Sequence, residues 1–140
     1  MSFRILWPAM RWPDGREIES SSVGEHTAEF SERYQDVTQE QWENCDAIVT
    51  INDVPDEYKK MLKKCRIVVT PKVGFDNIDL ASWSKLGVPV CNIPDYGTQE
   101  VADHARALML SLMKGISFHT RELKKDTSGL WRPALNPFGK

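Results

Sequence analysis

Two short apolar runs on either side of a helical segment constrain the fold of this chain more than any other feature. The runs, Ile67–Thr70 and residues 88–91, lack polar alternation, which is typical of strands covered on both faces of a parallel sheet. Residues 79–85 between them are expected to form a helix that stops at Gly87, because glycine takes the left-handed conformation past a helix end without steric cost. The stretch therefore predicts a strand–helix–strand crossover.

The same alternation continues through the rest of the chain. Further strands are expected at residues 3–7, 28–34 and 47–51, and short helices at residues 16–21 and 38–45. Thr38 and Gln41 have the spacing of a capping box, and Pro55 suits the first turn of another helix. This last helix is expected to place apolar side chains inward and four lysines outward: Tyr58, Met61 and Leu62, and Lys59, Lys60, Lys63 and Lys64.

This order predicts an α/β fold with a doubly wound parallel sheet of about five strands. A long helix is expected to follow at residues 98–116, with the Thr98 hydroxyl capping its first turn. Residues 105–113 are apolar nearly all round, so this helix should be buried or lie in an interface. Residues 119–125 are expected to add a helical turn.

The bulk composition excludes several classes of protein. The net charge of −2 gives no indication of nucleic acid or of an anionic membrane as a partner. No apolar run approaches the roughly 20 residues of a membrane span, and the N-terminus does not resemble a signal peptide. The three cysteines are few and widely spaced, which favours reduced thiols and a cytoplasmic location.

The sequence also lacks the motifs of several kinds of catalytic site. No two of the eight glycines have the spacing G-x-G, so neither a dinucleotide fingerprint nor a P-loop is present. The three histidines show no metal-ligand spacing, and His104 is expected to be a helix-surface or packing residue. Cys91 is expected to be buried in its strand rather than to act as a nucleophile.

The loop at residues 71–77 is the most promising site. It follows a buried strand, contains Gly74 and precedes a helix, so its backbone N–H groups could hold a carboxylate or phosphate, with Lys72 adding a positive charge. The alternative is structural: Gly74 relieves a tight turn, while Asp76 or Asn77 caps the next helix.

Three segments resemble the D-isomer-specific 2-hydroxyacid dehydrogenases: VGFDNID at residues 73–79, GVPVCNIPDY at 87–96 and TQEVADH at 98–104. The resemblance implies a flavodoxin-like substrate domain at residues 1–97, a connecting and dimerisation helix region at 98–126, and a tail at 127–140. That tail would lead to a nucleotide-binding domain absent from these residues. The family's glycine fingerprint and its catalytic arginine, glutamate and histidine lie in that domain.

By this resemblance, the substrate would be a small 2-hydroxy or 2-oxo acid. Its carboxylate would meet the backbone N–H groups of Val73 and Gly74, beside Lys72, which stands where many relatives have glycine. Asn52 occupies a substrate position where several relatives have arginine or serine. Thr98 and Val101 would face the nicotinamide and phosphates of NAD(P), a cofactor that this chain is not expected to bind alone.

Two functional hypotheses follow. The chain is expected to be the substrate-domain part of a truncated D-2-hydroxyacid dehydrogenase, inactive alone; the alternative is a stand-alone flavodoxin-like module that binds a small anion or a protein. A receiver-type signalling domain would need clustered acids after the first strand, and residues 7–10 have none. The apolar helix at residues 98–116 is expected to make a homodimer, for which exchange of the helix between subunits is one arrangement.

Overall fold

The computed structural model describes residues 2–10 and 16–125. The chain divides into two compact units, Met1–Tyr96 and Gly97–Lys140. The tail expected at residues 127–140 lies outside the described residues.

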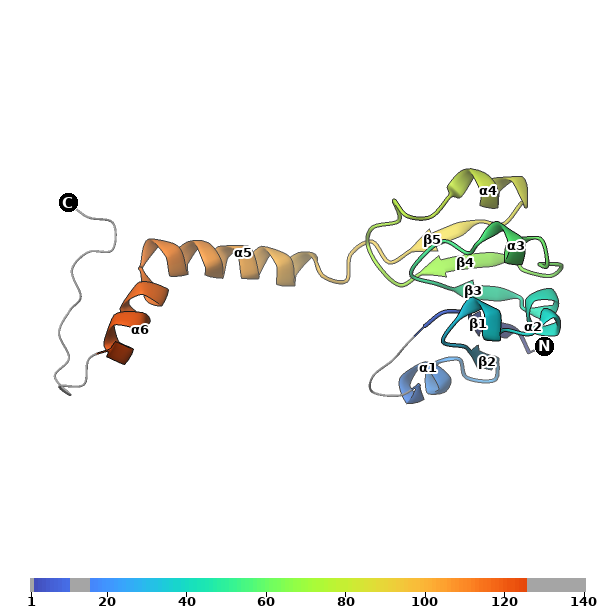
Figure 1. Ribbon diagram of the computed structural model, residues 1–140, viewed down its shortest axis with the longest axis horizontal. Helices are drawn as coiled ribbons and strands as arrows, with labels where there is room; N and C mark the ends of the chain where they lie inside the picture. Colours follow the sequence, from blue (N-terminus) through green and yellow to red (C-terminus); the bar gives the residue numbers. More distant parts are fainter. Residues whose placement is uncertain (1, 11–15, 126–140) are drawn as a thin grey trace. The chain divides into compact units, whose positions relative to one another are not determined.

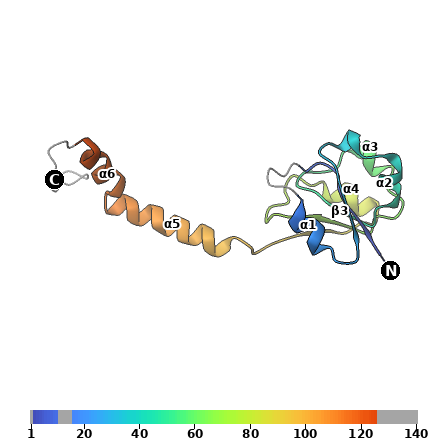
Figure 2. The ribbon, with the colours of Figure 1, turned by 90° about the horizontal axis from the view of Figure 1, so that it is seen from below.

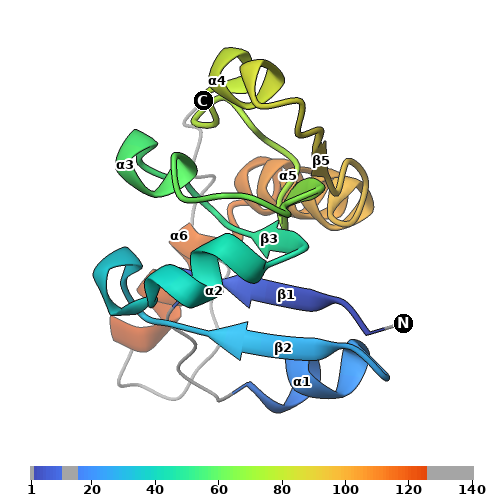
Figure 3. The ribbon, with the colours of Figure 1, turned by 90° about the vertical axis from the view of Figure 1, so that its right-hand side faces the viewer.

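The first unit is built on a sheet of five parallel strands (Figure 1). They are β1 Arg4–Trp7, β2 Thr27–Phe30, β3 Ala47–Val49, β4 Ile67–Thr70 and β5 Val90–Asn92. Their order is β2-β1-β3-β4-β5, which is the flavodoxin-like order and confirms the predicted fold class. Figure 3 shows β2, β1 and β3 following one another across the sheet. In such sheets ligands bind beyond the carboxyl ends of the strands.

Short helices connect these strands. They are α1 Glu17–Ser22, the 3-10 turn η1 Tyr34–Asp36, α2 Gln39–Asn44, α3 Asp56–Lys59 and α4 Leu80–Lys85. The predicted capping box of Thr38 and Gln41 is confirmed at the start of α2. The N-cap of α4 is Asp79, which accepts from the N–H groups of Ala81 and Ser82, so the expectation of a cap at Asp76 or Asn77 was wrong.

The hydrophobic core lies on one face of the sheet. Leu6, Ile48 and Val68 face it from three adjacent strands, and Ile48 lies between the other two in the pairing register. Trp42 from α2 and Trp83 from α4 are fully buried against them. Figure 2 shows α2 and α3 on one side of the sheet and α1 on the other.

The opposite face of the sheet is more open than the sequence predicted. Ile5, Val49 and Val69 line a groove of about 540 Å³ there, together with Val23 after α1. Cys91 pairs with Val69 on the edge strand β5 and is exposed, so the prediction of a buried cysteine was wrong. An unbroken apolar run indicates that both faces of a strand are apolar. It does not show which segment covers each face.

The second unit contains two helices, α5 Thr98–Met113 and α6 Ile116–Lys125. The helix predicted over residues 98–116 ends early because Gly115 takes the left-handed conformation, with φ of 62°. The N-cap of α5 is Gly97 and no side chain caps the helix, so the predicted role of the Thr98 hydroxyl was also wrong. No side chain of α5 is buried. None of the described helices is long and apolar enough to cross a membrane.

Candidate functional site

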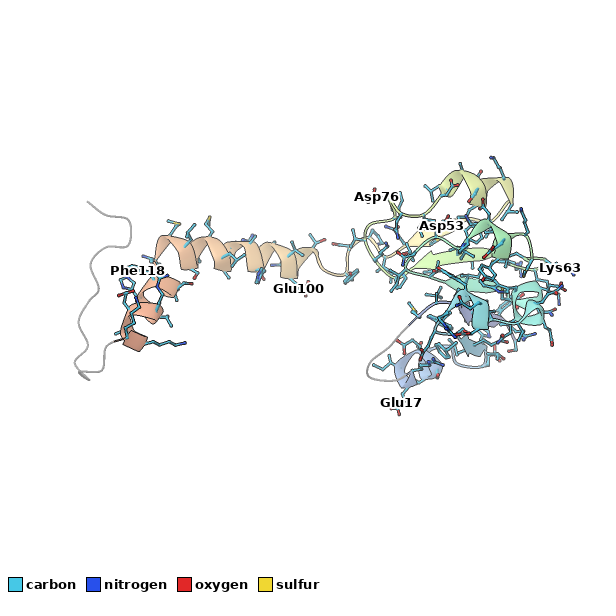
Figure 4. The ribbon with its side chains drawn as sticks, in the orientation of Figure 1. Glu17, Asp53, Lys63, Asp76, Glu100 and Phe118 are labelled. Carbon is cyan, nitrogen blue, oxygen red and sulfur yellow. The ribbon has the colours of Figure 1, made fainter. Side chains whose placement is uncertain are left out.

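The candidate site lies in the loops that follow β3 and β4 at the carboxyl edge of the sheet. Figure 4 labels Asp53 and Asp76, one from each of these loops. Among the residues singled out from the sequence, Asn52 belongs to the first loop, and Lys72, Val73 and Gly74 belong to the second.

A single amide side chain ties the two loops together. Asn77 Nδ2 donates to the Asn52 side-chain oxygen at 2.8 Å and to the carbonyl of Ile51 at 3.0 Å. The Asn77 Oδ1 atom accepts a short hydrogen bond from the Lys72 ammonium group. The structure therefore brings Asn52 and Lys72 together through Asn77, a residue to which the sequence assigned only a helix-capping role.

Contacts with β5 and the loop after it fix the direction of the backbone at residues 72–74. The Lys72 carbonyl accepts from the N–H of Ile93 at 3.2 Å, and the Val73 carbonyl accepts from Asn92 Nδ2 at 2.7 Å. In a trans peptide unit the C=O and the following N–H point in opposite directions. The N–H groups of Val73 and Gly74 consequently point away from β5, and within the described residues neither donates a hydrogen bond.

Gly74 does not adopt a conformation that requires glycine. The described glycines with positive φ are Gly24, Gly87 and Gly115. A Cβ atom added to Gly74 would lie 3.5 Å from Asp76 Oδ2, an ordinary contact distance. Relief of a tight turn therefore does not explain this glycine.

A buried lysine supports the loop after β3. The Lys59 side chain is 4% exposed, and its ammonium donates to Asp53 Oδ2 at 2.7 Å and to the Ser82 hydroxyl at 2.6 Å. Asp53 Oδ1 accepts from Trp83 Nε1 at 2.9 Å. The expectation that Lys59 lies on the outer face of its helix was wrong, because Asp53 and Ser82 provide polar partners on the inner side. The segment next to Asn52 is thereby fixed to α4.

This arrangement suits a small carboxylate. Two neighbouring N–H groups aimed the same way can donate to an anion, and backbone donors of this kind form anion-binding concavities. The Lys72 ammonium has an amide oxygen as its hydrogen-bond partner, so its charge remains available to a ligand. The Asp76 carboxylate beside Gly74 opposes a highly charged anion. The local charge therefore favours a monocarboxylate over a phosphate.

The residues expected to face NAD(P) belong to the other unit. Thr98 is the first residue of α5, and Val101, in the same turn, is exposed. His104 is an exposed residue of the same helix. No group of histidine, cysteine and acidic side chains suited to a metal ion occurs among the residues that the structure describes.

The residues described here do not fit the phosphates of a dinucleotide. Such a cradle is a glycine-rich turn from a strand into a helix. The glycines with positive φ instead follow the ends of helices: Gly24 after α1, Gly87 after α4 and Gly115 after α5.

The comparisons with known proteins agree with this fold. The family model described as "D-isomer specific 2-hydroxyacid dehydrogenase, catalytic domain" matches residues 13–130. A glyoxylate reductase of Korarchaeum cryptofilum is 32% identical over 100 residues, which cover 70% of this chain and 29% of the relative. A glyoxylate reductase of Pyrococcus furiosus is 34% identical over 100 residues, covering 67% of this chain and 30% of the relative.

Solved structures show the same likeness. The NADPH-dependent glyoxylate/hydroxypyruvate reductase of Sinorhizobium meliloti, solved with citrate, has a TM-score of 0.72 at 24% identity and covers 97% of this chain and 44% of that one. A D-lactate dehydrogenase from Treponema pallidum has a TM-score of 0.71 at 18% identity, covering 95% of this chain and 42% of that one. At these identities, the structures support the fold alone.

The chain thus spans about 30% of the length of the curated relatives that it matches. Its five-stranded parallel sheet and the match over residues 13–130 correspond to the family's catalytic domain. This chain belongs to the D-isomer-specific 2-hydroxyacid dehydrogenase family.

Proposed function

We propose that the first unit of this chain binds the carboxylate of a small 2-hydroxy or 2-oxo acid as part of a D-2-hydroxyacid dehydrogenase. The carboxylate oxygens accept hydrogen bonds from the N–H groups of Val73 and Gly74, and the Lys72 ammonium balances the charge. Asn52, in the loop after β3, contacts the remainder of the acid. The observation that carries this proposal is the pair of unengaged N–H groups directed away from β5.

Within this proposal the unit binds and orients the acid but does not oxidise or reduce it. NAD(P) would exchange the hydride in the complete enzyme, and a nucleotide-binding half would hold that cofactor and the catalytic side chains. Thr98 and Val101 would lie beside the cofactor that this nucleotide-binding half holds. The sheet unit supplies no phosphate cradle in its described residues, so we expect the 140-residue chain alone to bind neither NADH nor NADPH.

Binding of glyoxylate to the isotope-labelled 140-residue chain tests the carboxylate site. We expect the backbone amide resonances of Val73 and Gly74 to shift on titration, and those of α1 to remain in place. Lys72→Gln should weaken binding by roughly 10- to 100-fold, since a hydrogen bond to a charged group contributes about 1.5–3 kcal/mol. Lys85→Gln removes the same charge from an exposed lysine at the end of α4 and should leave the affinity unchanged.

Three results would contradict the proposal. One is a shift confined to other loops, and another is equal weakening by both lysine variants. The third is the absence of any shift at millimolar glyoxylate while the chain remains folded. A fluorescence titration with NADH in the same samples addresses the cofactor, since saturable binding would show a dinucleotide site that the glycine pattern does not predict.

We further propose that the chain forms a homodimer through the helical segment at residues 98–116 and that it acts in the cytoplasm. The dimer is supported by the exposed apolar side chains of α5, which include Leu108, Met109 and Leu112. The location is supported by three cysteines that are all free thiols. Exchange of α5 between subunits is one form that this dimer can take.

A further inference from the structure

Two of the three cysteines lie close together on neighbouring segments of the sheet unit. Cys45 follows α2 and leads into β3, while Cys65 leads into β4. Ala47 of β3 pairs with Ile67 of β4, and one step earlier the N–H of Arg66 donates to the carbonyl of Asp46 at 2.8 Å. These contacts place Cys45 and Cys65 next to each other on adjacent segments that run in the same direction.

Adjacent segments of a sheet lie close enough for a disulfide between them. Neighbouring strands lie roughly 4.7–4.9 Å apart, within the range of about 4.4–6.8 Å that separates the Cα atoms of bridged cysteines. Both side chains also point to the same region, because Cys45 belongs to the hydrophobic core and Cys65 packs against it.

The two thiols are chemically unequal. Hydrogen bonding with Cys65 and burial raise the pKa of the Cys45 thiol. The interaction with the neighbouring Cys45 lowers the pKa of Cys65, although burial and the charge of Asp46 oppose this effect. Cys65 is also the more accessible of the two, since it is half-buried and its neighbours Lys64 and Arg66 are exposed.

We propose that Cys45 and Cys65 form a reversible dithiol–disulfide pair that reacts with low-molecular-weight disulfides such as oxidised glutathione. The Cys65 thiolate attacks one sulfur of the small disulfide, breaks its S–S bond and releases one half as a thiolate. The Cys45 thiol then gives its proton to solvent, and its sulfur displaces the second half from Cys65. The protein dithiol loses two electrons, and the small disulfide is reduced to two thiols.

The flanking charges fit this co-reactant. Glutathione disulfide is an anion at neutral pH, and Lys64 and Arg66 on either side of Cys65 provide positive charge for its approach. The crosslink would close the segment between Cys45 and Cys65, which contains Asn52, Asp53 and Lys59. Oxidation therefore restrains the loop after β3 but does not occupy the carboxylate site.

Cys91 provides an internal control. It is exposed on β5, beside Val69, and belongs to a different part of the sheet from the other two cysteines. In the Cys91→Ser chain, oxidised glutathione should consume both remaining thiols, lower the intact mass by about 2 Da and leave no glutathione attached. Dithiothreitol should restore both thiols.

Single variants separate the two roles. In the Cys91→Ser background, Cys45→Ser should stop at one glutathione attached to Cys65. Cys65→Ser should leave the buried Cys45 unmodified in the folded chain. If the Cys45→Ser chain does not fold, the Cys65→Ser variant and a peptide map of the oxidised wild type still test the disulfide. The map must show a crosslink between the peptides that carry Cys45 and Cys65.

Two outcomes would overturn the proposal. The first is a Cys91→Ser chain that accumulates attached glutathione or disulfide-linked dimers without an internal crosslink. The second is a chain in which both thiols stay free under conditions that fully modify Cys91 of the wild type.

Discussion

Asp53 connects three separate parts of the sheet unit. Its carboxylate accepts from the Lys59 ammonium at 2.7 Å and from the Trp83 indole N–H at 2.9 Å, and its carbonyl accepts from the Tyr34 hydroxyl at 3.2 Å. The sequence did not predict this cluster, because α3 has only four residues and its pattern is too short to separate an inward from an outward face. Neighbours from distant parts of the chain decide where the lysine lies.

The Asp53→Asn variant tests the importance of the ion pair between Asp53 and the buried Lys59. It leaves the Lys59 ammonium without its shortest carboxylate contact, so we expect the free energy of unfolding to fall by about 2–3 kcal/mol. Asp56 also approaches Lys59, at 3.4 Å, but it is 79% exposed, and Asp56→Asn should cost only about 0.5 kcal/mol. Urea unfolding followed by tryptophan emission measures both, and equal losses would contradict the role given to Asp53.

Asn77 shows a second limit at the residue scale. The loop proposed to bind an anion, with Lys72 and Gly74, could be selected from the sequence because it follows a buried strand and contains glycine. The hydrogen bonds from Asn77 to Asn52 and to the Ile51 carbonyl could not, since they join residues 25 and 26 positions apart. Sequence spacing identifies the loop, but the partner that holds it depends on strand order.

At the scale of the helices, two threonines with similar expectations behave differently. Thr38 accepts from the N–H of Gln41, and the Gln41 side chain accepts from the Thr38 N–H, as predicted for a capping box. Thr98 lies inside the first turn of α5, and Gly97 takes the capping position. The prediction for Thr38 included a reciprocal partner, Gln41, three residues later. The prediction for Thr98 relied on a single hydroxyl.

Replacing Thr38 should therefore destabilise α2. We expect Thr38→Ala to lower the free energy of unfolding by about 1 kcal/mol, because the N–H of Gln41 loses its acceptor. Thr38→Ser retains the hydroxyl and should remain within about 0.5 kcal/mol of wild type. Thermal unfolding by circular dichroism provides the comparison, and a Ser variant as unstable as the Ala variant would exclude the cap as the cause.

At the scale of the whole molecule, alternating apolar runs and helical segments were sufficient to predict five parallel strands and their class of fold. They could not show that one sheet face remains partly open or that every α5 side chain is at least partly exposed. Periodicity identifies which side chains must be covered, but the segment that covers them need not belong to the same stretch of chain. The exposed apolar side chains of α5 are the reason for proposing a dimer.

Sedimentation velocity tests the proposed dimer. Leaving side chains such as Leu108 and Leu112 in water costs about 1.5–3 kcal/mol each relative to burial, so the wild-type chain should sediment as a dimer. Leu112→Glu places a charge on a side chain that is 70% exposed in α5 and should shift the chain towards monomer. Ile18→Glu makes the same change at a 75% exposed site in α1 and should preserve the dimer. A compact wild-type monomer would contradict the proposal.

The groove bordered by Ile5, Val49 and Val69 has a practical consequence for handling this protein. We expect dyes that fluoresce in apolar surroundings to bind this surface on the native chain, before any heating begins. Dye-based thermal-shift assays will therefore start from a high baseline and understate the melting transition. The indole emission of the buried Trp42 and Trp83 reports unfolding without this interference.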